Sequence, residues 1–117
     1  MSRIRVETTI TNHKTKENIK KELDAIMTNN RIVYKEDGII SLDILEDKII
    51  LKRTTHDREM TLEFIENKKT KCIYNVLNHR IDLNVYTKKI IKNDKLIEID
   101  YSIEEESIKY KLVIKWF

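Results

Sequence analysis

The chain has 117 residues, of which 37% are charged and 40% hydrophobic, with 23 Lys and Arg against 20 Asp and Glu. This length suits one modest core, so we expect a single domain over residues 1–117. The charge balance, at +3, is too even to identify a polyanion-binding protein, and one cysteine excludes a disulfide framework within the chain. No apolar run approaches the roughly 20 residues that span a bilayer. Residues 1–11 lack the apolar core of a signal peptide, so the sequence predicts a soluble cytoplasmic protein.

Residues 3–11 form the first predicted element, a strand, because Ile4, Val6 and Thr8 alternate with charged residues. The chain is rich in isoleucine, and β-branched side chains fit the pleated surface of a sheet. With one glycine and no proline, its turns must be built from Asn, Asp and Lys.

The segment 17–27 fits two structures. A helix that starts with Thr15 as its N-cap would gather four apolar residues on one face: Ile19, Leu23, Ile26 and Met27. A strand would gather a different four, with Lys21 as the one polar exception on that face: Ile19, Leu23, Ala25 and Met27. The local pattern alone favours the helix.

From residue 31 to the C-terminus, apolar and polar residues alternate in short runs that are separated by short polar turns. The expected strands are 32–34, 40–44, 49–53, 59–64, 72–76, 81–87, 97–103 and 108–116. The expected turns are 37–38, 46–47, 55–57, 66–69, 78–80, 92–94 and 104–107. Strands at this spacing without helical spacers predict an all-β antiparallel meander with one apolar face. Closure into a barrel would remove its exposed edges.

An ordered string of residues begins at Tyr34. It consists of Tyr34-x-Glu36, Arg53 before Met60-x-Leu62-x-Phe64, Tyr74 with Thr87, and Ile97-x-Ile99-x-Tyr101. In order and spacing this string resembles the YwiB-like family of uncharacterised bacterial proteins. The resemblance implies a calycin-like, lipocalin-like barrel of about eight to ten strands, and it makes 17–27 a strand, since a helix there would leave the barrel one strand short. It implies no activity and no ligand.

Arg53 is the most informative single residue of the sequence. Ile49 and Leu51 set the inward face of its strand, so the period of two points the Arg53 side chain into the barrel. An interior charge needs a partner, and the same parity turns Glu36 inward. We therefore expect an ion pair between Glu36 and Arg53 at the barrel mouth, with the hydroxyls of two tyrosines nearby: Tyr34 and Tyr74. Such a pair either closes one end of the barrel or anchors an anionic ligand.

Other aromatic and hydroxyl side chains share the inward parity. The aromatic ones are Tyr34, Tyr74, Tyr101, Tyr110 and Trp116. Such residues either line a pocket or pack as core with their hydroxyl groups bonded. Thr87 is expected to end a long strand on the same face. The candidate ligand-binding residues are therefore Arg53, Glu36, Tyr34, Tyr74, Thr87 and Tyr101.

Several kinds of site are not supported. The three histidines fall in turns without metal-ligand spacing, and Cys72 reads as a small buried apolar residue, so neither a metal nor a cofactor is expected. There is no Gly-x-Ser-x-Gly motif, and a single glycine cannot build a phosphate-binding loop.

The sequence thus predicts a non-enzymatic binding module for a small apolar or anionic amphipathic ligand. One alternative is a protein-interaction domain with a filled core that acts through its surface. Another is weak nucleic-acid binding through lysines near the strand ends, where Tyr86 is the one nearby aromatic residue. The lysines concerned are Lys68, Lys69, Lys71, Lys88, Lys89 and Lys92. Nucleic acid is the weaker of the expected partners, and the sequence does not predict an oligomeric state.

Overall fold

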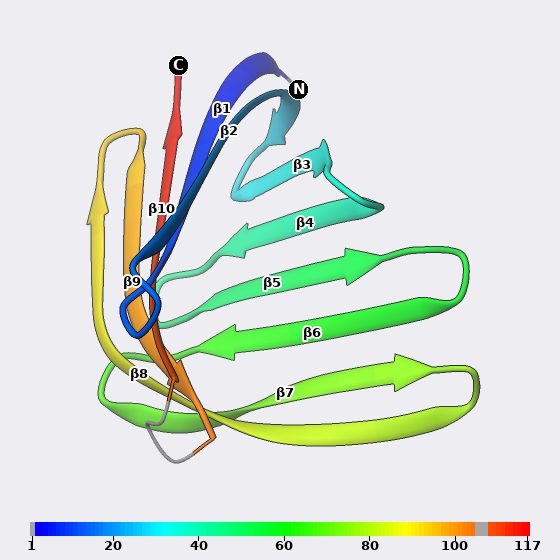
Figure 1. Cartoon of the computed structure of the whole chain (residues 1–117). Helices are drawn as coiled ribbons and strands as arrows, with labels where there is room; N and C mark the ends of the chain where they lie inside the picture. Colours follow the sequence, from blue (N-terminus) through cyan, green and yellow to red (C-terminus); the bar gives the residue numbers. More distant parts are fainter. Residues whose placement is uncertain (1, 105–107) are drawn as a thin grey trace.

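The computed structural model describes residues 2–104 and 108–117. The described chain forms ten strands: β1 (Ser2–Asn12), β2 (Glu17–Thr28), β3 (Arg31–Lys35), β4 (Ile39–Ile44), β5 (Ile49–Thr54), β6 (Arg58–Phe64), β7 (Lys68–Val76), β8 (His79–Asn93), β9 (Leu96–Ile103) and β10 (Ile108–Trp116). Each strand pairs with the next, and β1 pairs with β10, so the meander closes into an antiparallel barrel (Figure 1). This confirms the predicted all-β fold, with a strand number at the upper end of the expected range. The described residues contain no helix long and apolar enough to cross a membrane.

The ambiguous segment is a strand, as the resemblance implied. β2 pairs with β1 along its length, from Ser2 opposite Met27 to Asn12 opposite Glu17. A continuous ladder of backbone hydrogen bonds with β1 outweighs the local helical pattern, because tertiary pairing overrides a weak propensity. Ile19 has the inward parity but is 52% exposed. In the described structure β3 pairs only with the last residues of β2, so nothing lies beside Ile19 on that edge.

The barrel interior is filled by side chains from the inward face of each strand. The largest fully buried ones are Phe64, Ile32, Ile40, Leu42, Ile49, Ile97, Ile99 and Ile114. The Phe64 ring meets the Tyr101 ring edge-on at 4.9 Å, and the Tyr101 ring stacks on Tyr110 at 5.4 Å. The interior of a small barrel holds packed side chains in this way.

β8 differs from its predicted form. It runs for 15 residues, and Thr87 lies within it rather than at its end. The pairing with β9 shifts between Thr87 and Lys89, which leaves Lys88 as an extra residue. Such a bulge bends a strand, and Figure 1 shows β8 curving from beside β7 to run beside β9.

The turns follow the expected chemistry with two exceptions among the described residues. Left-handed backbone occurs mostly at Asn, Asp and Lys, but it also occurs at Leu77 (φ 47°), beside Asn78 (φ 68°) in the β7–β8 turn, and at Glu104 (φ 53°) after β9. Two turns are shorter than predicted, since β7 begins at Lys68 and β8 at His79. Of the predicted turn 104–107, only Glu104 lies within the described residues.

Candidate functional site

One row of inward residues crosses seven strands, from β2 to β8, near one end of the barrel. It consists of Ala25, Tyr34, Ile40, Arg53, Met60, Tyr74 and Ile81, each the cross-strand partner of the next. The β3–β4, β5–β6 and β7–β8 turns lie beyond this row on one side of the molecule (Figure 1). We call this row and these turns the barrel mouth. Three of the six predicted site residues, Tyr34, Arg53 and Tyr74, thus share one row.

A cleft of about 580 Å³ opens at the barrel mouth. Its walls come from β5, β6, β7 and the turns beside them: Asp37, Arg53, Thr55, His56, Asp57, Arg58, Met60 and Tyr74. The cleft therefore combines charged groups with the apolar surfaces of Met60 and Tyr74.

Arg53 is half-buried, and its buried Nε atom has no hydrogen-bond partner among residues 2–104 and 108–117. Within the described chain, no carboxylate oxygen lies within 4.0 Å of its guanidinium. A buried donor without a partner is destabilising by about 1–3 kcal/mol, and more for a charged group. A buried donor of this kind calls for a hydrogen-bond acceptor.

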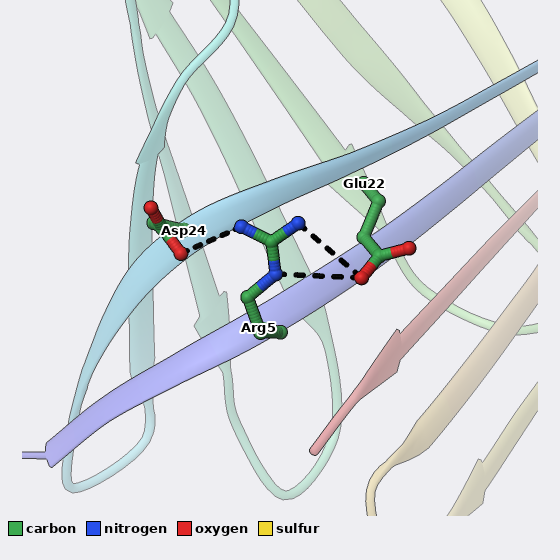
Figure 2. A network of polar contacts seen from close by, with 3 residues as sticks. All are labelled: Arg5, Glu22 and Asp24. Carbon is green, nitrogen blue, oxygen red and sulfur yellow. Dashed lines mark hydrogen bonds and ion pairs between the residues drawn. The ribbon is translucent and has the colours of Figure 1, made fainter.

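Arg5 shows how other arginines of this protein find carboxylate partners. On the outer face of β1, its Nη1 donates to Asp24 Oδ1 at 2.7 Å, and its Nη2 lies 3.3 Å from Glu22 Oε1 (Figure 2). The hydrogen bond to Asp24, followed by that to Glu22, raises the pKa of Arg5. Arg31 and Arg80 are paired with aspartates at 2.6 and 2.8 Å. Arg53 differs from all of these because it is more buried yet has no carboxylate.

The predicted ion pair between Glu36 and Arg53 is wrong. Glu36 Oε1 lies 3.1 Å from Nζ of Lys21, the residue that broke the apolar pattern of β2. Lys21 has inward parity, opposite Thr8, so it reaches Glu36 from a neighbouring strand. Glu36 lies two residues beyond Tyr34, just after β3, whereas Arg53 is on β5. Because β4 lies between these two strands, they are two strand spacings apart, or about 10 Å. The adjacent lysine therefore neutralises Glu36 and leaves Arg53 unpaired.

Tyr34 lies between these charges. It is 5% exposed, and burial is the main cause that raises the pKa of its hydroxyl. The charge of Glu36 raises that pKa further, whereas the charge of Arg53 lowers it. Tyr34 therefore stays a neutral hydroxyl beside the guanidinium.

Arg58 is a residue of the mouth that sequence reasoning missed. Its guanidinium hydrogen-bonds the Tyr74 hydroxyl, which is the main cause that raises the Arg58 pKa. Asp57 Oδ1 lies 3.7 Å from Arg58 Nε and accepts a hydrogen bond from Thr55 Oγ1 at 3.1 Å. Strand parity says nothing about such turn residues, which the sequence identified only as a turn. The Tyr74 hydroxyl thus faces Arg58 rather than being free beside Arg53.

Thr87 and Tyr101 do not join the mouth. They pair with each other on β8 and β9, and the Tyr101 ring meets Phe64. Phe64 pairs with Ile49 of β5. Ile49 is four residues before Arg53, so these rings lie about 13 Å along the strand from the mouth. The hydroxyl of Thr87 is buried there, without a hydrogen-bond partner in the described part of the chain.

A family model described as a domain of unknown function (DUF1934) matches residues 4–114. The chain belongs to the DUF1934 family. The crystal structure of the ywiB protein from Bacillus subtilis is similar, with a TM-score of 0.69 at 16% identity over 97% of this chain and 88% of that chain. This likeness confirms the YwiB-like resemblance and the barrel fold. No curated protein matches the chain.

Membership of the DUF1934 family brings no activity, so the chemistry of this barrel rests on its own residues. Among residues 2–104 and 108–117, no three His, Cys, Asp or Glu side chains gather to hold a metal ion. The absence of metal and cofactor stays a prediction.

Gly38 holds the β3–β4 turn of this DUF1934 barrel against the end of β5. Its φ is +117°, and a Cβ atom there would lie 2.6 Å from the carbonyl oxygen of Thr54. We expect Gly38→Ala to destabilise the protein by about 1–3 kcal/mol, because both the backbone conformation and the contact with Thr54 are strained. Urea denaturation would measure this. Lys35→Ala, an exposed change on β3, is the control, and equal stability of the two variants would contradict this packing of the turn.

Proposed function

We propose that this barrel is a binding module that holds a small anionic amphipathic ligand at its mouth, with Arg53 as the anchor. The observation that carries the proposal is the buried Nε of Arg53, which has no hydrogen-bond partner among the residues that the structure describes. A guanidinium presents several N–H donors in a planar fork that matches a carboxylate. A ligand carboxylate at Arg53 would therefore supply the partner that Glu36 does not.

The size and the walls of the cleft support a small amphipathic ligand. Its volume of about 580 Å³ lies within the range of small-molecule sites, which is roughly 300–1,000 Å³. Met60 and Tyr74 flank Arg53 along the row, so an apolar tail has surfaces to contact. The interior beyond the mouth is packed with core side chains, which favours a short tail that stays in the mouth.

The burial of the charges around the cleft favours an anion. Two arginines and two aspartates line it: Arg53, Arg58, Asp37 and Asp57. Asp57 compensates Arg58 at 3.7 Å, and Asp37 is exposed to solvent, which screens its charge. Arg53 is then the half-buried positive charge that remains for a ligand, and partial burial strengthens its attraction relative to that of an exposed charge. A guanidinium keeps its proton, so Arg53 is suited to hold a ligand rather than to transfer a proton. This supports binding without catalysis.

Isothermal titration with octanoate and octan-1-ol tests the proposal, since the two share a tail and differ in charge. Octanoate is expected to bind more tightly than octan-1-ol. Arg53→Met should weaken octanoate binding by roughly 10- to 100-fold, since hydrogen bonds to a charged group contribute about 1.5–3 kcal/mol. Octan-1-ol binding should change little.

Arg80→Met is the matched control, because Arg80 is exposed, is paired with Asp82 and does not line the cleft. It should bind octanoate like the wild type. Circular dichroism would establish that both variants keep the sheet spectrum. Unchanged octanoate affinity in folded Arg53→Met, or equal affinity for the alcohol and the acid, would overturn the proposal. The predicted alternative, a protein-interaction domain that acts through its outer surface, would then be favoured. The cytoplasmic location stays a prediction.

A further inference from the structure

A second cleft lies on the outer face of the barrel, where β8, β9 and β10 run side by side. Its volume is about 400 Å³. The residues around it are mostly basic, aromatic or hydroxyl-bearing: His13, Tyr86, Lys88, Asp100, Tyr101, Ser102, Lys109, Tyr110 and Lys111. Neither Arg53 nor any other residue of the barrel mouth contributes to it.

A row of cross-strand partners forms the floor of this outer cleft. Lys69 of β7 lies opposite Tyr86 of β8, Tyr86 lies opposite Ser102 of β9, and Ser102 lies opposite Lys109 of β10. These residues are on the face opposite to the core, because their neighbours Val85, Thr87 and Tyr101 are the buried ones. The partly exposed ring of Tyr86 is therefore flanked by a lysine on one side and a serine and a lysine on the other.

The β8 bulge adds a further cation to this row. Lys88 is the extra residue between Thr87 and Lys89, and it lines the outer cleft two residues after Tyr86. Bulges re-aim side chains and are frequent beside functional sites. Without the bulge, the alternation along β8 would stay in register with β9.

Ser102 gives the outer cleft a polar group below its surface. It is only 6% exposed although it belongs to the outward face. Ser102 lines the cleft, so its hydroxyl is within reach of a ligand bound there.

The charge of the outer cleft favours an anion. Three lysines line it against one aspartate, Asp100. Lys111 is held by Glu98 at 3.0 Å, whereas Lys88 and Lys109 form no ion pair within the described chain. Within the described residues, two lysines without an ion pair thus lie near Tyr86 and Ser102: Lys88 follows Tyr86 on β8, and Lys109 lies opposite Ser102 on β10.

We propose that this outer cleft binds a nucleotide unit of single-stranded nucleic acid. The base stacks on Tyr86, phosphates contact Lys88 and Lys109, and the Ser102 hydroxyl donates to an oxygen of the nucleotide. An aromatic platform flanked by lysines is the combination that single strands require. Lys69 extends the positive charge onto β7, which suits a strand that continues past one nucleotide.

Fluorescence anisotropy with a labelled oligouridylate of about ten nucleotides tests this proposal on the whole chain. Tyr86→Ala should weaken binding by about five-fold or more, because stacking on an aromatic residue contributes at least about 1 kcal/mol per base. Tyr86→Phe should bind like the wild type. With about three phosphate contacts, affinity should fall roughly 20-fold between about 50 and about 200 mM salt.

The double variant Lys88→Gln, Lys109→Gln should bind more weakly and show a salt dependence smaller by about 1.4 in log–log slope. Lys35→Gln, Lys115→Gln removes the same charge from exposed positions on β3 and β10 and should leave binding unchanged. The mononucleotide UMP and a duplex of equal length should each bind at least ten-fold more weakly than the single strand. Equal affinity of Tyr86→Ala and wild type, or equal binding of UMP, duplex or heparin, would overturn the proposal.

Discussion

Replacement of Phe64 by alanine is expected to lower the free energy of unfolding by about 3–5 kcal/mol. Phe64 is 0% exposed, its ring meets Tyr101 edge-on, and its strand partner is the buried Ile49. Truncation would remove apolar contacts and leave a cavity in a close-packed core, and both effects destabilise the fold. Since domains of this size are stable by about 5–15 kcal/mol, this loss would remove from about a fifth of the stability to all of it.

Urea denaturation followed by circular dichroism would measure this loss. Ile39→Ala is the control because Ile39 is 51% exposed on the outer face of β4, and its effect should be within about 0.5 kcal/mol. A loss below about 1 kcal/mol for Phe64→Ala would contradict the close packing of the interior. It would then reopen the barrel interior as a place for a ligand.

The second large effect is a loss of stability in alkali. Burial, followed by the charge of Glu36, raises the pKa of Tyr34 well above its usual value, and burial does the same for Tyr101. Above about pH 10, the unfolded chain releases both protons while the folded chain keeps them. The folded state then binds more protons, so stability is full below this pH and falls as the pH rises.

Each of these two tyrosines should lower the free energy of unfolding by about 1.36 kcal/mol per pH unit above about pH 10. Burial also raises the pKa of Cys72, which adds a decline of the same sign that begins at lower pH. Urea unfolding between about pH 8 and about pH 11 would measure the slope. Tyr34→Phe and Tyr101→Phe should each make the decline shallower. An identical slope in both variants and the wild type would show that neither hydroxyl is held neutral by the fold.

The fold was accessible from the sequence because a period of two is a direct record of which side of a strand faces the core. The alternation that Ile49 and Leu51 set on their strand correctly predicted that the Arg53 side chain points inward. The pattern of β2 was harder, because Lys21 stands where a core residue would be expected. Its ion pair with Glu36, which the sequence could not place, explains that exception.

The composition of the candidate site was less accessible. The alternation shows on which face of the sheet a residue lies, but it does not show how neighbouring strands are aligned. That alignment decides that Lys21, rather than Arg53, contacts Glu36. The bulge after Thr87 has no signature in the alternation, so the extent of β8 was missed. The turn residues Asp57 and Arg58 line the cleft through local geometry that depends on the packing of separate hairpins.

The central claim is that the Arg53 guanidinium is the anchor for an anionic ligand at the barrel mouth. Its most direct test is the ¹H–¹⁵N signal of the Arg53 side-chain Nε–Hε group during titration with octanoate. We expect this signal to shift with the octanoate concentration and to become protected from exchange, while the Nε–Hε signal of Arg80 stays in place. An unmoved Arg53 signal at concentrations where octanoate binds elsewhere on the barrel would contradict the claim.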